Sequence, residues 1–133
     1  MKAVLDTNVL LSAFLFGGKP RQLIERALEG RLALYTSPAL LTEIRNTLAR
    51  SKFMLSPALA TIMMEELEQL VTLVYPSERI HRACRDTKDH IVLECACESR
   101  CHAIVSGDND LLVMKQFRGI PILRVAECLD RLV

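Results

Sequence analysis

Short apolar runs that alternate with longer amphipathic segments constrain the fold of this chain most strongly. The runs are continuously apolar, a pattern typical of strands in a parallel sheet that is covered on both faces. They lie at residues 3–5, 32–35, 73–75, 103–105 and 120–125. Two of the segments between them open with a serine followed by a proline, a common helix start. The alternation predicts an α/β domain, although residues 73–75 could instead continue the preceding helix.

Length and composition favour one domain over residues 1–133. Half of the residues are hydrophobic and only 5% are aromatic, which is enough for a sizeable aliphatic core. The net charge of +1 neither favours nor excludes nucleic acid as a partner. Five cysteines without framework spacing predict reduced thiols in a cytoplasmic protein, and the Cys95–His102 cluster lacks zinc-site spacing. No run approaches the roughly 20 apolar residues of a membrane helix, so we expect no membrane partner.

Polar side chains follow two of the apolar runs, where strands are predicted to end. Asp6 and Asn8 follow the first run, and Ser106, Asp108 and Asp110 follow the fourth. Ligands of parallel α/β sheets bind beyond the carboxyl ends of the strands, so these side chains are placed where a site can form. The alternative is that the aspartates only cap turns and helices.

Asp89 lies at the start of a helix predicted over residues 88–99. Its position falls near the middle of the apolar face, where a carboxylate is costly unless it is paired or hydrogen-bonded. Glu94 and Glu98 fall on the opposite side of this helix, and His90 lies at the flank. Capping of the helix start is the open alternative for Asp89.

Glu43 lies in the helix that follows Ser37-Pro38. The apolar arc of that helix consists of Leu40, Leu41, Ile44 and Leu48. Glu43 projects roughly 60° outside one edge of the arc, so it can border the core and still reach a cleft. A solvated surface glutamate is the alternative.

Taken together, these carboxylates predict a metal site. Several carboxylates at one rim of a sheet repel one another unless divalent cations lie among them. Hard oxygen ligands without a neighbouring histidine or cysteine set indicate Mg²⁺ or Mn²⁺. One or two such ions can ionise a water near neutral pH and stabilise charge on a phosphodiester during its hydrolysis.

Four stretches of the chain resemble the PIN-domain ribonucleases, in particular the group known as toxins of toxin–antitoxin pairs. They are LDTNVLLSA near the start, SPALLTEI around Glu43, RDTKDHIVLECA around Asp89 and AIVSGDNDLL around Asp108. They occur in the family's order and span essentially the whole chain, whereas DTN alone would be weak evidence. The resemblance implies a five-stranded parallel sheet of order 3-2-1-4-5 with helices on both faces.

The resemblance also implies roles for individual residues. The acids that gather Mg²⁺ or Mn²⁺ in the family match Asp6, Glu43, Asp89 and Asp108. Asp110 matches a further acid, which we treat as an auxiliary ligand. Positions that orient carboxylates by hydrogen bonds match Asn8 and Ser106, with Thr7 as a supporting candidate. The implied reaction is metal-assisted hydrolysis of RNA, in which water deprotonated with the help of a carboxylate attacks the phosphorus in line.

Two residues near Asp89 depart from the family pattern or have two interpretations. His90 stands where an amide, a carboxylate or another small polar group is more common. It either touches substrate or faces solvent, and we favour solvent. Asp86 is either a helix cap or an outer acid of the site, and we favour the cap.

Basic residues near the predicted site are candidates for phosphate contacts with RNA. One group has three-residue spacing before Asp89 and consists of Arg79, Arg82, Arg85 and Lys88. A second group follows Glu43 and consists of Arg45, Arg50 and Lys52. The alternative is a solvated basic face.

The family resemblance implies two protein partners, a small antitoxin that blocks the acidic cleft and a second copy of the chain in a dimer. The amphipathic helix at 57–71 could serve the antitoxin contact. Core packing explains its apolar stripe equally well.

Three other functions compete with a ribonuclease. A haloacid-dehalogenase-like phosphatase needs an aspartate two positions after Asp6, where this chain has Asn8. A non-catalytic PIN-fold module that binds RNA or a partner would be favoured by a missing acid, and all four acids are present. A scaffold whose aspartates only cap helices would show no Mn²⁺ binding that depends on Asp6 and Asp89.

Overall fold

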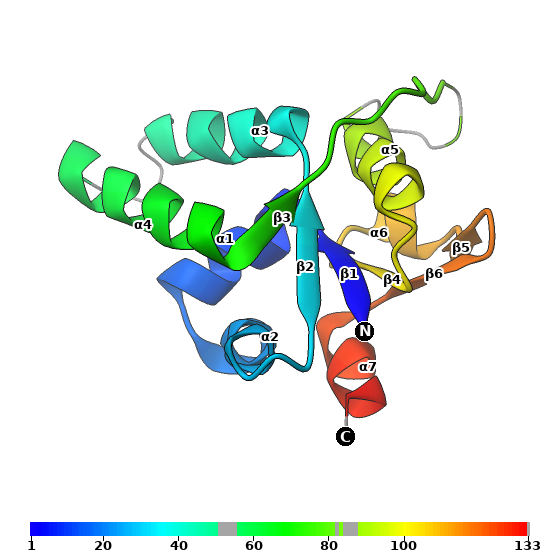
Figure 1. Cartoon of the computed structure of the whole chain (residues 1–133), viewed down its shortest axis with the longest axis horizontal. Helices are drawn as coiled ribbons and strands as arrows, with labels where there is room; N and C mark the ends of the chain where they lie inside the picture. Colours follow the sequence, from blue (N-terminus) through cyan, green and yellow to red (C-terminus); the bar gives the residue numbers. More distant parts are fainter. Residues whose placement is uncertain (51–55, 82, 84–87, 133) are drawn as a thin grey trace.

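Six strands form the central sheet in the computed structural model, which describes residues 1–50, 56–81, 83 and 88–132 (Figure 1). Along the chain they are β1 (Lys2–Leu5), β2 (Ala33–Thr36), β3 (Val71–Leu73), β4 (Ala103–Val105), β5 (Gln116–Phe117) and β6 (Ile120–Leu123). Across the sheet their order is β3-β2-β1-β4-β6-β5, with β5 antiparallel to β6 and the other neighbours parallel. The predicted five-stranded parallel sheet of order 3-2-1-4-5 is confirmed, with β6 as its fifth strand.

Strand β5 was not predicted. It pairs with β6 through a tight hairpin in which Phe117 lies opposite Ile120. The two residues of the turn, Arg118 and Gly119, have positive φ angles of 50° and 83°. Hairpin turns of this length favour positive φ, but arginine is an uncommon residue for that conformation, so the sequence signal is weak.

Two predicted strands differ by two residues from their bounds in the structure. The strand predicted at 73–75 lies two residues earlier, because α4 ends at Leu70 and the chain becomes extended at Val71. The strand predicted at 120–125 ends at Leu123, since a helix begins shortly after it. Both differences arise where a helix and a strand follow each other almost without a turn.

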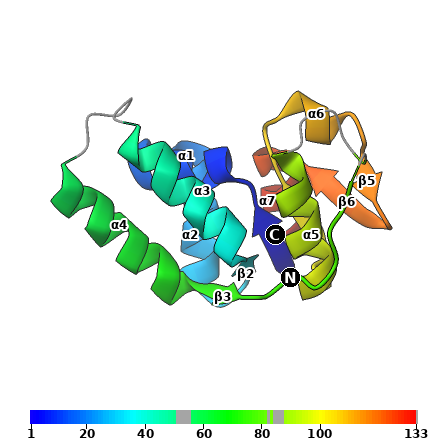
Figure 2. The same ribbon diagram turned by 90° about the horizontal axis from the view of Figure 1, so that it is seen from above.

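Seven helices cover the two faces of the sheet in the described parts of the chain. They are α1 (Thr7–Leu15), α2 (Gly18–Leu28), α3 (Pro38–Ala49), α4 (Pro57–Leu70), α5 (Asp89–Ser99), α6 (Asn109–Leu112) and α7 (Val125–Arg131). In Figure 2, α3 and α4 lie to one side of β1 and α5 lies to the other. Among these helices, none is both long and apolar enough to cross a membrane.

Alternating side chains of β1 contribute to two separate apolar cores. Ala3 and Leu5 join buried residues of α1–α4 and α7 on one face, whereas Val4 joins buried residues of α5 and α6 on the other. The central strand is therefore covered on both faces, which explains its continuous apolar sequence.

The serine–proline pairs begin helices as predicted. The Ser37 hydroxyl accepts a hydrogen bond from the Leu40 backbone N–H at 3.3 Å, at the start of α3. Ser56 accepts from the Leu59 N–H at 3.2 Å in the same way at the start of α4. The caps satisfy backbone donors that have no partner inside the helix.

Aspartates cap the helices that follow β1 and β4. Asp6 precedes α1 and accepts a hydrogen bond from the Val9 N–H at 3.1 Å, while its own N–H donates to the Val105 carbonyl at 3.0 Å. Asp108 precedes α6 and accepts from the Asp110 N–H at 2.9 Å. Capping and a shared location at the carboxyl ends of adjacent strands therefore occur together, and the cap does not exclude a functional site.

Candidate metal centre

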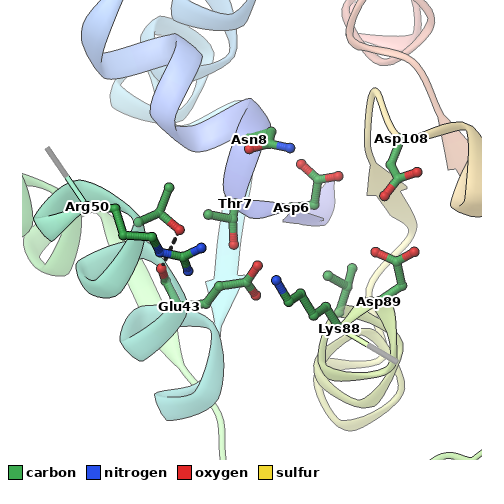
Figure 3. A pocket seen from close by; sticks show the side chains of 10 residues that line it. Asp6, Thr7, Asn8, Glu43, Arg50, Lys88, Asp89 and Asp108 are labelled. Carbon is green, nitrogen blue, oxygen red and sulfur yellow. Dashed lines mark hydrogen bonds between the residues drawn. The ribbon is translucent and has the colours of Figure 1, made fainter. Parts of the chain in front are cut away.

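A cavity of about 270 Å³ opens at the carboxyl ends of β1 and β4 (Figure 3). Its walls come from the β1–α1 junction, from α3, from the start of α5 and from the segment between β4 and α6. The lining residues are Asp6, Thr7, Asn8, Glu43, Thr47, Arg50, Lys88, Asp89, Val92 and Asp108. The four acids that the sequence predicts as principal metal ligands thus line one cavity, although they lie far apart along the chain.

Three carboxylates at this site are close enough to share one cation. One oxygen from each of Asp89, Asp108 and Asp110 lies within 4.8 Å of the other two. Within the described ranges, this is the one group of three or more acidic, histidine or cysteine side chains that meets that spacing. Asp89 is buried, and the other two are half-buried. Asp110, expected only as an auxiliary ligand, belongs to this group, whereas Asp6 and Glu43 line the cavity outside it.

Asp6 is buried and held by hydrogen bonds on both carboxylate oxygens. The Ser106 hydroxyl donates to Oδ2, and the Val9 N–H donates to Oδ1. The Ser106 hydroxyl also accepts from the Asp108 backbone N–H at 2.9 Å, so it connects the ends of β1 and β4. Burial raises the pKa of Asp6 above its ordinary value and the nearby Asp108 carboxylate adds to the rise, while the hydrogen bonds oppose it.

Glu43 reaches the cavity from α3 and is half-buried. Burial is the main cause that raises its pKa, and the Asp6 carboxylate acts in the same direction. The Thr7 hydroxyl, the Lys88 ammonium and the Arg50 guanidinium favour the charged form and lower the pKa. Glu43 therefore lies between a buried, acidic neighbourhood and a set of cationic and hydroxyl groups.

Thr7 and Asn8 occupy different depths of the cavity. Thr7 is buried, and its hydroxyl points toward the Glu43 carboxylate (Figure 3). Asn8 is exposed, and its backbone N–H favours the charged form of Asp6 and so lowers the pKa of that carboxyl. The side chain predicted to orient a carboxylate thus lies at the rim.

Comparison with known proteins assigns the family. The PIN domain profile matches residues 2–110. The chain belongs to the PIN-domain family. The resemblance found in the sequence is thereby confirmed, and the cavity lies at the carboxyl end of this PIN domain's sheet.

Other relatives agree with this assignment. The PIN domain is 30% identical over 124 residues to the uncharacterized protein MJ1680 of Methanocaldococcus jannaschii, a match covering 86% of this chain and 76% of the relative. Its fold is similar to a chain of VapBC2 from Rickettsia felis, which was crystallised with a DNA fragment from its promoter. The TM-score is 0.67 and the sequence identity 12%, over 93% of this chain and 98% of that one. PAE2754 from Pyrobaculum aerophilum has a TM-score of 0.65 and 18% identity, over 99% of this chain and 89% of that one.

The polar side of α5 is partly covered in this PIN domain, so the prediction that His90 faces solvent is wrong. His90 and Glu94 are each only 8% exposed. The segment that follows β3 packs along this side of the helix. The Glu94 carboxylate accepts from the Ile80 N–H at 2.8 Å, and His90 Nε2 accepts from the Ala83 N–H at 3.3 Å. Glu98, one turn further, accepts from the Ser77 N–H at 2.9 Å.

Three side chains spaced four residues apart thus bind backbone donors spaced three apart. Four residues advance a helix by about 6 Å, whereas three residues of fully extended chain span roughly 10 Å. A segment that is less than fully extended can therefore place one N–H group beside each turn of α5. Sequence periodicity could not reveal this, because the covering segment has no repeat of its own. The interpretation of Asp86 as a cap lies outside the described residues.

The basic residues predicted to contact phosphate divide into two sets. Arg50 and Lys88 line the cavity. Arg79 pairs with the buried Glu94 at 3.4 Å, and Arg45 pairs with Glu68 at 3.4 Å on the surface, so both are engaged elsewhere. Arg82, Arg85 and Lys52 lie outside the described residues.

The cysteines in the described part of the chain are free thiols. Burial raises the pKa of Cys95 to about 12 and that of Cys128 to about 11. Burial likewise raises the pKa of Cys97 and Cys101. Cys84 lies outside the described residues.

Proposed function

We propose that this PIN domain is a Mg²⁺- or Mn²⁺-dependent endoribonuclease that hydrolyses RNA phosphodiester bonds. The observation that carries the proposal is the meeting of Asp89, Asp108 and Asp110 oxygens within 4.8 Å of one another, beside the cavity that Asp89 and Asp108 line. Like charges at that spacing raise the free energy of the empty site, and a divalent cation relieves the repulsion.

The donor set fits a hard divalent cation. The three grouped carboxylates supply oxygen ligands, and Asp6 stands beside Asp108 through their common partner Ser106. Carboxylate oxygens without thiolate or imidazole partners suit Mg²⁺ and Mn²⁺ better than Zn²⁺. When bound, the cation would make water more acidic and stabilise negative charge on the phosphate.

The chain's own residues then have separate tasks. Ser106 and the Val9 N–H fix the direction of the Asp6 carboxylate. Glu43, whose pKa is raised by burial, is suited to take a proton from the attacking water. Arg50 and Lys88 lie in the same cavity and provide positive charge for the phosphate groups on either side of the bond to be cut.

As biological context we propose the toxin role in a toxin–antitoxin pair, in the cytoplasm, with an antitoxin and a second copy of the chain as partners. Fold similarity to a VapBC2 chain supports this context. On α4, Met64 and Leu67 are buried in the core while Leu59 and Ile62 are about half exposed. The helix therefore packs on the core through one stripe and keeps a second apolar stripe for a partner.

A ribonuclease assay over RNAs of varied sequence tests the proposed activity. Wild-type protein should cleave with Mg²⁺ or Mn²⁺ and stop cleaving in EDTA. Asp6→Asn and Asp89→Asn should lose cleavage while keeping the circular dichroism spectrum of the wild type. Asp130→Asn is the matched control, because Asp130 is an exposed aspartate on α7, outside the residues that line the cavity.

The same assay separates an enzyme from a non-catalytic module. Activity of Asp6→Asn or Asp89→Asn equal to that of the wild type would contradict the site assignment. Wild-type protein that binds Mn²⁺ and RNA but leaves every RNA intact would favour the binding module instead.

A further inference from the structure

Lys88 places a positive charge at the acidic cavity. It immediately precedes α5 and has helical backbone angles (φ −62°, ψ −28°), so its Cα is held in line with the helix that carries Asp89. Its side chain lines the cavity together with four carboxylates. Figure 3 shows its ammonium nitrogen directed at the Glu43 carboxylate, with Asp89 on its other side.

The cavity therefore has two parts, a group of carboxylates and a carboxylate that lies beside an ammonium. The Asp89, Asp108 and Asp110 oxygens are close enough together for one metal ion, and Glu43 lies outside that group. On the Glu43 side, the Lys88 ammonium favours the ionised carboxylate and lowers its pKa against the opposing effect of burial. The Thr7 hydroxyl acts in the same sense from the floor of the cavity.

A lysine ammonium and a divalent cation can perform one task in common and differ in another. Both attract a carboxylate and a phosphate oxygen through Coulomb interaction. The ammonium is a compact charge with three N–H donors and no vacant coordination position, so it cannot acidify a water as a metal ion does. A site with one of each would hold phosphate on both sides but activate water on one side only.

We infer that the Lys88 ammonium takes the place of a second divalent cation beside Glu43, so that the cavity binds one divalent cation, at Asp89, Asp108 and Asp110. This inference rests on the proposed function and specifies how its charges are arranged. Glu43, proposed above to accept a proton from the attacking water, then also orients the Lys88 ammonium, and Lys88 contacts the phosphate.

Counting the Mn²⁺ ions bound per chain tests the inference without relying on catalysis. Isothermal titration of metal-free protein with Mn²⁺ at neutral pH should give one site in the wild type. Lys88→Met removes the ammonium and keeps most of the side chain's length, so Glu43 should become available and a second site should appear. Adding Glu43→Gln to Lys88→Met should return the number of sites to one.

Two further variants make the result specific. Lys88→Arg keeps the positive charge and should bind one Mn²⁺ ion. Lys19→Met, a change of the same type at an exposed lysine of α2 outside the cavity lining, should also bind one. Circular dichroism of each variant confirms that the fold is retained.

The outcomes separate this inference from the proposed function. Two Mn²⁺ ions in the wild type, or a single ion in both wild type and Lys88→Met, would overturn the inference while leaving a metal-dependent ribonuclease intact. A wild-type protein that binds no Mn²⁺ would overturn the proposed function together with it. One ion in the wild type, two in Lys88→Met and one in the double variant would support it.

Discussion

Two carboxylates on α5 are buried to nearly the same extent and have opposite surroundings. Asp89 is 7% exposed and Glu94 is 8% exposed. Glu94 accepts a backbone N–H at 2.8 Å from Ile80 and pairs with the Arg79 guanidinium at 3.4 Å. Asp89 instead faces two further carboxylates, those of Asp108 and Asp110.

The contrast shows that the extent of burial alone does not reveal what surrounds an acid. Donors around Glu94 compensate its charge, so it stabilises the fold without any ligand. The Asp108 and Asp110 carboxylates near Asp89 add repulsion, which a divalent cation would relieve under the proposed function. Grouping with other carboxylates, rather than the extent of burial, separates Asp89 from Glu94.

Asp89→Asn should have the largest effect on function. Loss of one of three grouped ligands should lower Mn²⁺ affinity and cleavage rate by more than about 100-fold, since even groups that only orient ligands are worth up to that much. Stability of the metal-free protein should not fall, because a repulsive charge is removed. Titration with Mn²⁺, rate measurement and urea unfolding test this, with Asp130→Asn as the control. If Asp89→Asn bound Mn²⁺ as tightly as the wild type does, Asp89 would not differ from Glu94 in the way described.

Ser106→Ala should give the next largest effect, because Ser106 supplies the donor that aligns a cavity carboxylate. Without its hydroxyl, Asp6 loses one hydrogen bond and the Asp108 N–H loses its acceptor. We expect cleavage to fall roughly 10- to 100-fold. Ser106→Thr, which keeps a hydroxyl, serves as the comparison variant. Equal loss in both variants would point to packing at this fully buried position rather than to the hydrogen bond.

Glu94→Gln should reduce the stability of the protein more than its activity, the opposite of what we expect for Asp89→Asn. The amide keeps the shape but loses the charge that binds the Ile80 N–H and Arg79, at a cost of about 1–3 kcal/mol in the free energy of unfolding. Urea denaturation measures this, and Mn²⁺ affinity at low temperature should stay near that of the wild type. The exposed Glu65→Gln on α4 is the control. A Glu94→Gln protein as stable as the wild type would contradict a structural role.

Asp6→Asn should produce the smallest change in free energy and carry a pH signature. Because burial raises the pKa of Asp6 in the folded chain, the native state binds its proton more tightly than the unfolded state does. The ionised form therefore costs stability above the folded pKa, and this cost disappears as pH falls below the ordinary value of 3.8. Asparagine removes the cost and still caps α1, so metal-free Asp6→Asn should be about 1 kcal/mol more stable at neutral pH.

Urea unfolding in EDTA at several pH values measures this difference between Asp6→Asn and the wild type. The advantage of the variant should shrink as pH decreases toward 3.8. An advantage that grows in acid would mean that the folded pKa of Asp6 is lowered instead.

Local and periodic features were predictable from the sequence, and contacts between distant segments were not. The serine–proline helix starts depend on short-range signals and agree with the structure, whereas the strand order was implied by the family resemblance and not by the local pattern. The meeting of acids at one rim followed from the rule that strand ends collect at one edge. The closeness of the Asp110 oxygen to that of Asp89 was not predictable, because it depends on how α6 turns, which no spacing reveals.

His90 was misplaced for a related reason. A helical projection assigns each residue to an apolar or a polar side and takes the polar side to face water. Here the segment after β3 returns along the polar side, and its backbone N–H groups need acceptors when they are covered. His90 and Glu94 supply them. A polar residue can thus be predicted to face solvent although it is buried, when the segment that covers it has no periodic sequence pattern.

The segment at 74–81 also connects the two edges of the sheet. It leaves β3 at one edge, and Glu78 within it forms two hydrogen bonds of 2.8 Å with Arg118, in the turn beside β5 at the other edge. Both side chains are about half exposed, so salt screens their attraction. Raising ionic strength should weaken the attachment of the segment at 74–81 before it affects the strands. Amide hydrogens of Ser77 and Ile80 should then exchange with deuterium sooner than those of β1 and β4. The Glu78–Arg118 pair would thereby join the two edges of the open sheet with a strength that depends on salt concentration.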